Sequence, residues 1–361
     1  MNTDAEWMRH CLTLAQRGAG CTAPNPLVGA VVVQADEVVG VGFHPRAGQP
    51  HAEVFALHQA GVRAQGATLY VNLEPCHHQG RTPPCTQSIR QSGVTRVVVG
   101  MVDPNPLVQG RGLVALQAAG LDVTTGVLEQ ECRDLNRAFT HFITTGRPWG
   151  VWKYAMTLDG KLATVTGDSF WVSGEPARAQ VQMLRNQVDA VIVGGQTVRR
   201  DNPRLTCRLP EGRNPLRVVL TRTLDLPHTA RLWQTAIAPT LVFTGPNHDR
   251  AMAEFLVSQG VEVQVLAQVT PNAVLTVLGQ RGLLSVLWEC GGNLAAQALH
   301  DGSIQQVLCF ISPKLIGGTQ APSPLGGVGV TWMREALPLE GVRVSQVGAD
   351  ILIEGVLSSS A

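Results

Sequence analysis

Four side chains in the first half of the chain are of the types that a catalytic zinc ion uses. His51 and Glu53 form a His-x-Glu motif, and Cys76 and Cys85 follow it, each directly after a proline. A catalytic zinc ion binds three protein ligands and leaves a fourth position for water, and one histidine with two cysteines supplies such a set. Glu53 then stays free of the metal, so its carboxylate can carry protons. The pattern predicts zinc ligation by His51, Cys76 and Cys85, with Glu53 as the catalytic residue.

The spacing of these residues resembles the signature of zinc-dependent nucleobase deaminases but departs from it at one point. That signature is H-x-E followed by P-C-x-x-C, whereas here the second cysteine comes nine residues after the first. His77 and His78 lie in the insert and are alternative ligands, and Cys11 and Cys21 are the alternative cysteines. A purely structural zinc site would more often have four protein ligands and no free carboxylate beside it. We favour the catalytic site because its residues occur together, in this order, at predicted strand and helix ends.

The chemistry expected of this set is the hydrolytic deamination of a ring. Zinc lowers the pKa of a bound water toward ~7, which provides a nucleophile for an amidine-like ring carbon. Glu53 would take the proton of the water and deliver it to the ring nitrogen and to the departing amine. Ammonia is then released.

The second half lacks the common dinucleotide-binding motif but gathers residues suited to a phosphorylated ligand. No G-x-G-x-x-G sequence occurs there between a strand and a helix. Gly291 and Gly292 join a predicted strand to a helix whose first amides favour a phosphate, although a simple turn would have the same sequence. Thr197, Asp201 and Arg208 follow another predicted strand. Because polar residues at strand ends mark the ligand crevice of an α/β sheet, we expect a binding site there.

Lysine is rare in this chain, and two of its lysines lie in one short segment. Of the 28 Lys and Arg residues, only Lys153, Lys161 and Lys314 are lysines. An ammonium is a compact point charge and a guanidinium is a planar fork, so the two are not equivalent as binding groups. Chance is the alternative explanation, and Lys153 is the lysine that we expect to bind substrate.

The composition restricts the class of protein. The 361 residues, 44% of them hydrophobic, suffice for two domains with separate cores. A net charge of +1 and 5% aromatic residues disfavour a nucleic-acid partner. The N-terminus lacks a signal-peptide pattern, and no apolar run approaches the roughly 18 residues of a membrane span. We expect a cytoplasmic protein without a membrane partner, whose eight cysteines are mostly buried thiols.

Alternating helices and strands are expected to position the zinc residues. The first half predicts an α-β-β-α-β-α-β-α-β-α order, with Asp4 as the cap of the first helix. Such an order is typical of a mixed or parallel sheet with helices on both faces. The predicted elements are helices at 4–18, 51–61, 83–93, 111–120 and 129–142 and strands at 28–33, 38–43, 67–75, 94–102 and 121–127.

Glycine and proline within 144–150 predict a junction, which divides the chain into domains 1–146 and 147–361. The second domain is expected to be α/β as well, with its last two strands forming an antiparallel pair. Its predicted strands are 151–158, 189–195, 216–222, 240–245, 261–267, 283–291, 305–312, 342–348 and 350–357, with helices that include 176–187 and 291–302.

The chain resembles the bifunctional deaminase/reductase family of riboflavin biosynthesis over essentially its whole length. The resemblance rests on TAPNPLVGAVVV, HAEVFAL, LEPCHHQGRTPPC and DPNPLVQGRG, and in the second half on segments such as KYAMTLDGKLAT. The insert that ends in GRTPPC separates this family from ordinary cytidine and tRNA adenosine deaminases. The resemblance implies a cytidine-deaminase-like three-layer domain that deaminates 2,5-diamino-6-ribosylamino-4(3H)-pyrimidinone 5′-phosphate. It further implies a dihydrofolate-reductase-like α/β domain that uses NADPH to reduce the ribosyl side chain, giving 5-amino-6-ribitylamino-uracil 5′-phosphate.

The resemblance also implies the remaining site residues, position by position. Those that would contact NADPH are Met156, Trp171, Thr197, Asp201, Gly291, Gly292, Asn293, Leu294, Ala295, Ala296 and Gln297. Those that would contact the ribose phosphate or its pyrimidine are Lys153, Ser169, Arg185, Leu205, Arg208 and Glu289. Asn25 is a candidate for holding the pyrimidine in the first domain, with a turn role as the alternative. Two positions depart from the family: His77 stands where a serine is usual, and Met156 where a small alanine is frequent.

Two other functions fit parts of the pattern. A nucleic-acid deaminase with an appended binding domain would need a basic surface with aromatic stacking residues. A regulatory module with a structural zinc ion, binding a nucleotide without turnover, would not need Glu53. The resemblance instead implies a small-molecule pyrimidine nucleotide as the substrate and a homo-oligomer, either a dimer or a tetramer, as the assembly.

Overall fold

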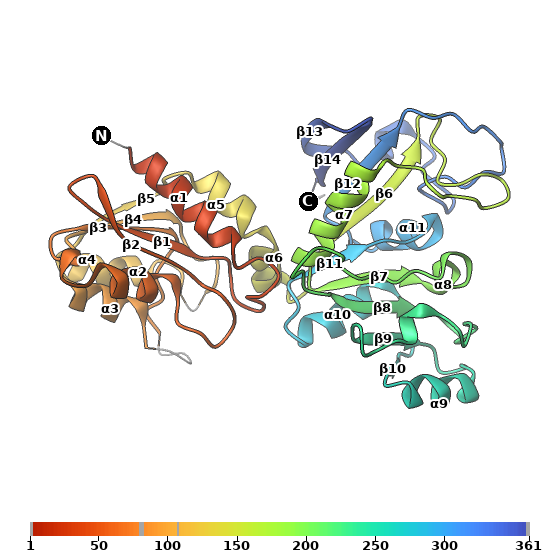
Figure 1. Cartoon of the computed structure of the whole chain (residues 1–361), viewed down its shortest axis with the longest axis horizontal. Helices are drawn as coiled ribbons and strands as arrows, with labels where there is room; N and C mark the ends of the chain where they lie inside the picture. The colour runs from red at the N-terminus through yellow and green to blue at the C-terminus, as the bar shows by residue number, and fades with distance from the viewer. Residues whose placement is uncertain (1–2, 79–82, 107, 359–361) are drawn as a thin grey trace. The chain divides into compact units, whose positions relative to one another are not determined.

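The structure, a computed structural model, describes residues 3–78, 83–106 and 108–358. The chain divides into two compact units, Met1–Gly146 and Arg147–Ala361 (Figure 1). Among the described residues, no helix combines the length and the apolar character needed to cross a membrane. Each unit is built around a sheet of its own.

The sheet of the first unit has the strand order β2-β1-β3-β4-β5. Strand β1 runs antiparallel to β2 and β3, whereas β3, β4 and β5 are parallel. The elements are α1 (Asp4–Gln16), β1 (Gly29–Gln34), β2 (Glu37–Phe43), α2 (Ala52–Ala60), the 3-10 helix η1 (Gly61–Ala64), β3 (Thr68–Leu73), α3 (Cys85–Ser92), β4 (Arg96–Met101), α4 (Arg111–Ala118), β5 (Asp122–Thr125), α5 (Glu129–Leu135) and α6 (Arg137–Thr145).

Helices cover both faces of this sheet, which makes three layers (Figure 1). On one face, Ala56 of α2, Ile89 of α3 and Leu116 of α4 pack in one core cluster with the strands. On the other face, Met8 of α1 and Cys132 of α5 belong to a second cluster. A strand that is buried on both faces is apolar along its whole length, which explains the AVVV sequence of β1.

Two local predictions in this unit were wrong. The cap of α1 is Thr3 rather than Asp4: its side chain accepts from the backbone N–H of Glu6, and Glu6 bonds back in a capping box. The helix predicted at 129–142 is broken into α5 and α6 at Asn136. The Asn136 side chain accepts from the Leu27 amide at 2.8 Å and donates to the Leu27 carbonyl at 3.0 Å. A tertiary contact therefore ends a helix that the local sequence would continue.

The sheet of the second unit has the order β10-β9-β8-β7-β11-β6-β12-β14-β13. In this order, each pair of neighbouring strands from β10 through β9, β8, β7, β11 and β6 to β12 is parallel. Strand β14 is antiparallel to β12, and β14 and β13 form the antiparallel pair that the sequence predicted. The elements are β6 (Trp149–Thr157), α7 (Glu175–Gln187), β7 (Ala190–Gly194), α8 (Gly195–Asp201), β8 (Leu216–Leu220), η2 (Arg231–Trp233), β9 (Thr240–Thr244), α9 (Arg250–Ser258), β10 (Glu262–Val265), α10 (Pro271–Gln280), β11 (Ser285–Trp288), α11 (Gly292–His300), β12 (Gln306–Ser312), η3 (Met333–Glu335), β13 (Leu339–Val347) and β14 (Asp350–Leu357).

Two core clusters lie on the two faces of this sheet. Val181 of α7 and Leu256 of α9 pack in one cluster, and Leu275 of α10 and Ala298 of α11 pack in the other. The parallel strands β11, β6 and β7 end at the same edge of the sheet. In α/β proteins this carboxyl edge is where ligands bind, so residues that follow these strands are candidates for a site.

Candidate active sites

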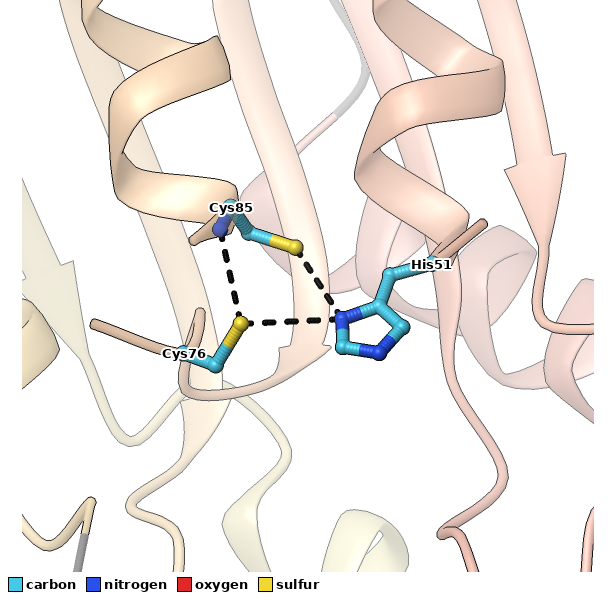
Figure 2. A group of neighbouring side chains, drawn as sticks. All are labelled: His51, Cys76 and Cys85. Carbon is cyan, nitrogen blue, oxygen red and sulfur yellow. Dashed lines mark hydrogen bonds between the residues drawn. The ribbon is translucent and has the colours of Figure 1, made fainter. Parts of the chain in front are cut away.

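The three predicted zinc ligands converge from two helix starts and one strand end. His51 caps α2, Cys85 is the first residue of α3, and Cys76 lies just beyond β3. The Nδ1 atom of His51 is 3.2 Å from Sγ of Cys85 and 3.6 Å from Sγ of Cys76 (Figure 2). The three ligand atoms lie within 4.8 Å of one another. A nitrogen and two sulfurs at this spacing fit a single tetrahedral zinc ion with one open position.

The two cysteines shift each other's pKa in opposite directions. A hydrogen bond from the Cys85 thiol lowers the pKa of Cys76 to about 4, and the His51 ring adds to that effect. The same bond raises the pKa of Cys85 well above its usual value. The cluster therefore holds one thiolate on its own. A bound divalent cation would favour the second thiolate, because metal ligation requires deprotonated sulfur.

Glu53 lies in the first turn of α2 and is almost completely buried, with 3% of its surface exposed. Burial raises the pKa of its carboxyl group, although the nearby His51 ring opposes that shift. Its Oε2 atom is buried without a hydrogen-bond partner among the described residues. A buried carboxylate oxygen without a partner is costly unless a ligand or a water meets it, so this atom fits a group that exchanges protons with a bound reactant.

A cavity of about 370 Å³ is lined by two of the predicted zinc ligands, His51 and Cys76, and by Glu53. Asn25 lines it, and its Nδ2 atom is 3.0 Å from Nε2 of His44. The other ring nitrogen of His44 is 3.1 Å from the carbonyl of Pro50, and burial lowers the pKa of this histidine. A neutral ring with Nδ1–H donating to Pro50 would accept from Asn25. Asn25 thus has a fixed orientation at the cavity wall.

A buried carboxylate fixes the segment after β4 that forms part of the lining of this cavity. Glu74 accepts the backbone N–H groups of Asp103 at 3.2 Å, Gly110 at 2.9 Å and Gly112 at 2.9 Å. These bonds fix the segment that places Asp103 and Asn105 in the cavity lining. Burial raises the pKa of Asp103 to about 6.

The alternative ligands lie apart from the metal cluster. His77 is 3.0 Å from the Thr86 hydroxyl, and Cys11 is buried in the core under α1. His78 lines the cavity, whereas Cys21 is exposed. Among the described residues, the only group of three or more His, Cys, Asp and Glu side chains close enough to share a metal is formed by the three predicted ligands. Gln79, Gly80, Arg81 and Thr82 of the insert and Leu107 of the DPNPLVQGRG segment lie outside the described residues.

The second unit has a cavity of about 580 Å³ at the carboxyl edge of β6, β7 and β11. Most of the residues expected there from the resemblance line it. These are Lys153, Ser169, Trp171, Arg185, Thr197, Asp201, Arg208, Glu289, Gly291, Gly292 and Asn293. Strands far apart in the sequence therefore bring the predicted side chains to one hollow.

An ion pair lies at the base of this cavity. Arg185 of α7 donates Nε to Oε1 of Glu289 at 2.6 Å and Nη2 to Oε2 at 2.8 Å, with side chains only 12% and 13% exposed. Burial alone would raise the pKa of Glu289, but Arg185, Lys153 and Arg208 outweigh it and lower that pKa. Burial lowers the pKa of Lys153, and Glu289 opposes the shift. The cluster thus has three cations around one carboxylate and suits an anionic ligand.

A second cavity, of about 680 Å³, adjoins the first at the carboxyl edge of β7, β8 and β11. Gln196, Thr197, Gly291 and Asn293 line both cavities, and Leu294 and Gln297 line the second. A Cβ atom added at Gly291 would meet no other heavy atom within 4 Å, so this backbone is open to an approaching ligand. Gly292 is different, because a Cβ there would come within 2.9 Å of the Ser323 carbonyl.

Four of the predicted residues do not line these cavities. Leu205 and Ala295 are buried in the core clusters. Met156 is half-buried on β6 opposite Ile311 of β12. Ala296 lies on α11 next to Gly327, whose added Cβ would approach it to 3.4 Å. The structure therefore places these four beside the hollow rather than on its surface.

Comparison with known proteins covers both units. The family model of the RibD C-terminal domain matches residues 148–353, and that of the cytidine and deoxycytidylate deaminase zinc-binding region matches residues 1–101. A riboflavin biosynthesis protein RibD from Synechocystis is 56% identical, with 99% of this chain and 97% of the relative covered. The chain belongs to the RibD family.

Solved structures agree with that assignment. Acinetobacter baumannii RibD matches with a TM-score of 0.88 and 38% identity, covering 99% of each chain. A diaminohydroxyphosphoribosylaminopyrimidine deaminase/5-amino-6-(5-phosphoribosylamino)uracil reductase from Thermotoga maritima matches with a TM-score of 0.85 and 37% identity, covering 98% of each. As a RibD protein, this chain is a bifunctional deaminase and reductase of riboflavin biosynthesis, with a zinc-binding deaminase region before a reductase region.

Several residues at the two RibD sites were not singled out from the sequence. His44, Glu74, Asp103 and Asn105 shape the first cavity, and Arg222 lines the second cavity of the reductase unit. Asp103 and Asn105 lie in the DPNPLVQGRG segment, which was noticed only as a family marker. The polar residues just after a strand were the available signal, because such positions reach the ligand edge of the sheet.

Proposed function

We propose that the first unit deaminates 2,5-diamino-6-ribosylamino-4(3H)-pyrimidinone 5′-phosphate and that the second reduces the ribosyl group of the product with NADPH. The two activities in the name of the Thermotoga maritima relative support this substrate pair. The observation that carries the proposal is the cluster of His51, Cys76 and Cys85 beside the buried, unpartnered carboxylate oxygen of Glu53. That arrangement has a metal-binding group and a proton carrier but, in the part of the chain that the structure describes, no fourth protein ligand.

In the deaminase unit, His51, Cys76 and Cys85 would hold zinc. When bound, zinc supplies a water of lowered pKa and stabilises negative charge. Glu53 holds a proton readily because burial raises the pKa of its carboxyl group. It would accept one proton from the attacking water and pass it to the ring nitrogen, and then carry the remaining hydroxyl proton to the leaving amine, so that the C–N bond breaks, ammonia departs and the ring gains a carbonyl. Asn25, oriented by His44, would hold the pyrimidine edge.

In the reductase unit, the cations around Glu289 would bind the phosphorylated sugar. Arg208 and Lys153 line the cavity with Arg185, and an arginine fork suits phosphate oxygens. Glu289, kept ionised by Arg185, would accept hydrogen bonds from a sugar hydroxyl or a ring N–H. Lys153 would donate a proton to the ring oxygen of the sugar as the ring opens, which is the step before C1′ accepts hydride.

NADPH is the cofactor that we propose for this unit, and it supplies the hydride when bound. Its fit rests on two adjoining cavities that share Gly291 and Asn293. The open backbone at Gly291 and the first amides of α11 suit a pyrophosphate. Trp171, which is 56% exposed and lines the first cavity, offers an aromatic surface beside the substrate residues. Assembly into a dimer or a tetramer stays a prediction.

One coupled assay tests this function. The purified protein is given the diamino pyrimidine nucleotide with and without NADPH, and ammonia release and NADPH absorbance are followed together. We expect ammonia in both cases and NADPH oxidation only after ammonia appears, with about one zinc per chain by metal analysis. Ammonia release that needs NADPH, or full deaminase activity in zinc-free protein, would contradict the proposal.

A further inference from the structure

The loop that carries Trp171 is held from outside the reductase cavity by Lys314. Lys314 lies just beyond β12, and its Nζ atom donates to the carbonyl of Trp171 at 2.7 Å and to that of Val172 at 3.0 Å. Trp171 and Val172 line the cavity, whereas Lys314 does not. Lys314 therefore contacts the backbone of two cavity-lining residues without lining the cavity itself.

The Trp171 ring is held by a second cation. The guanidinium of Arg178 lies 4.7 Å from the ring centroid, and its Nη1 atom donates to the carbonyl of Ser173 at 2.8 Å. Arg178 comes from α7, so the loop is fixed to the helix by one cation and to the segment after β12 by the other. An exposed aromatic side chain keeps one orientation only if such contacts outweigh its lost rotamer freedom.

The segment that carries Lys314 is itself well anchored. The Lys314 carbonyl accepts the amide of Leu158, just beyond β6, at 2.9 Å. Asp159 accepts the Gly317 amide at 2.7 Å and the Ile316 amide at 3.3 Å, and the Thr157 hydroxyl donates to Asp159 at 2.6 Å. Because β6 and β12 are paired neighbours, these hydrogen bonds continue the contact between the two strands beyond their ends. Lys314 thus connects the ends of these two strands to the loop that carries Trp171.

We propose that Lys314 is a positioning residue of the reductase that holds Trp171 in the orientation that binds the cofactor. This inference rests on the proposed function of the second unit. Cofactor affinity falls in proportion to the fraction of molecules that hold the binding-competent loop. If the loss of both hydrogen bonds leaves a tenth of the molecules with Trp171 in place, the KM for NADPH rises about tenfold while kcat changes little.

The other lysines of the chain provide the controls. Lys314→Met removes the ammonium and keeps most of the stem, and Lys314→Arg retains a cation that can donate to the two carbonyls. Lys161→Met makes the same change in a neighbouring loop, where the ammonium has no hydrogen bond or ion pair among the described residues. We expect a KM for NADPH about tenfold higher in Lys314→Met, a rise of at most threefold in Lys314→Arg, and none in Lys161→Met. Deaminase activity should be unchanged in all three.

A second background separates positioning from a general loss of structure. In Trp171→Ala protein there is no ring to orient, so adding Lys314→Met should change the KM for NADPH by less than about twofold. An equal tenfold effect in both backgrounds, or an unchanged KM in Lys314→Met alone, would overturn the inference. Wild-type protein that fails to oxidise NADPH with the deaminated substrate would instead refute the proposed function, so the two failures are distinct.

Discussion

Each unit has a glutamate of low solvent exposure beside the residues of its site, and the pKa values of these two carboxyl groups, Glu53 and Glu289, are shifted in opposite directions. Glu53 lies beside a metal-binding cluster without a cation paired to its Oε2 atom, and burial raises its pKa. Glu289 is mostly shielded from solvent as well, but Arg185 donates hydrogen bonds to both of its oxygens and the surrounding cations lower its pKa. The same residue type therefore serves as a proton carrier in one unit and as a fixed anion in the other.

The difference follows from what each reaction must move. Deamination transfers protons from water to nitrogen, so the carboxyl group must change its protonation state near neutral pH. Hydride transfer depends on holding a donor against an acceptor, and a permanent charge serves orientation best. Removing the charge should therefore stop the first reaction and only weaken the second.

The largest effect is expected from Glu53→Gln. An amide keeps the shape of the side chain but cannot carry a proton, so deaminase kcat should fall by roughly 10³-fold, within the range typical of general acid–base catalysis. Zinc content should stay unchanged, because His51, Cys76 and Cys85 are intact. Ammonia release by the variant is the measurement.

The reductase provides the internal control for that variant. When Glu53→Gln protein receives the already deaminated intermediate and NADPH, its rate should equal that of the wild type. Retained ammonia release would remove Glu53 from the mechanism. Loss of both activities would show that the two sites do not act independently.

Glu289→Gln should have an intermediate effect confined to the second unit. The variant leaves Arg185 without its anion in a buried site, and breaking a buried pair typically costs ~3–5 kcal/mol of stability. Cofactor oxidation should fall about 10–100-fold, mainly through a higher KM for the pyrimidine nucleotide. Steady-state kinetics with the deaminated substrate give this split, and deaminase activity should not change.

A matched pair elsewhere in the same unit separates function from stability. Glu262 also accepts two hydrogen bonds from one arginine, Arg281, but the Glu262 side chain is 55% exposed and lies away from the cavities. Glu262→Gln should change stability by less than ~1 kcal/mol and leave the reductase rate unchanged. If Glu289→Gln loses stability but keeps its KM, Glu289 is structural and the contrast with Glu53 fails.

The zinc residues were predictable from the sequence because their chemistry depends on residue type and order. His51, Cys76 and Cys85 each lie next to a helix or strand end, and such ends are signalled locally by proline and glycine. In the reductase unit, the places of Thr197, Asp201, Arg208, Gly291 and Gly292 after predicted strands indicated a binding site, whereas Arg185 and Glu289 were reachable only through the resemblance. Lys153, Arg185 and Glu289 come from β6, α7 and the end of β11, and no local spacing connects them.

The residues that support the sites could not be predicted, because their partners are distant in sequence. Glu74 contacts amides up to 38 residues away, and Asn136 breaks a helix by bonding to a residue 109 positions away. Lys314 reaches Trp171 across 143 positions. Composition alone marked Lys314 as one of three lysines, without indicating what it holds.

The smallest effect is expected at Asp4 of the first unit. Like Glu289, Asp4 accepts two hydrogen bonds from one arginine, but its side chain is more exposed. Arg96 donates to both oxygens of Asp4, at 3.0 and 2.8 Å, and this pairing lowers the pKa of Asp4 from its usual value. A lowered folded-state pKa stabilises the fold above the unfolded pKa of ~3.9, and the effect disappears as pH falls through the folded value. Asp4→Asn should therefore cost ~0.5–1 kcal/mol at pH 7 and progressively less as the pH falls below the unfolded pKa of Asp, with both activities unchanged. Hydrogen exchange of the amides in α1 and β4 measures the cost of this substitution as local opening within the full chain.

Asp122→Asn is the control, because Asp122 is 70% exposed and 3.4 Å from the same arginine. If Asp122→Asn cost as much as Asp4→Asn, net charge rather than the paired geometry would stabilise this unit.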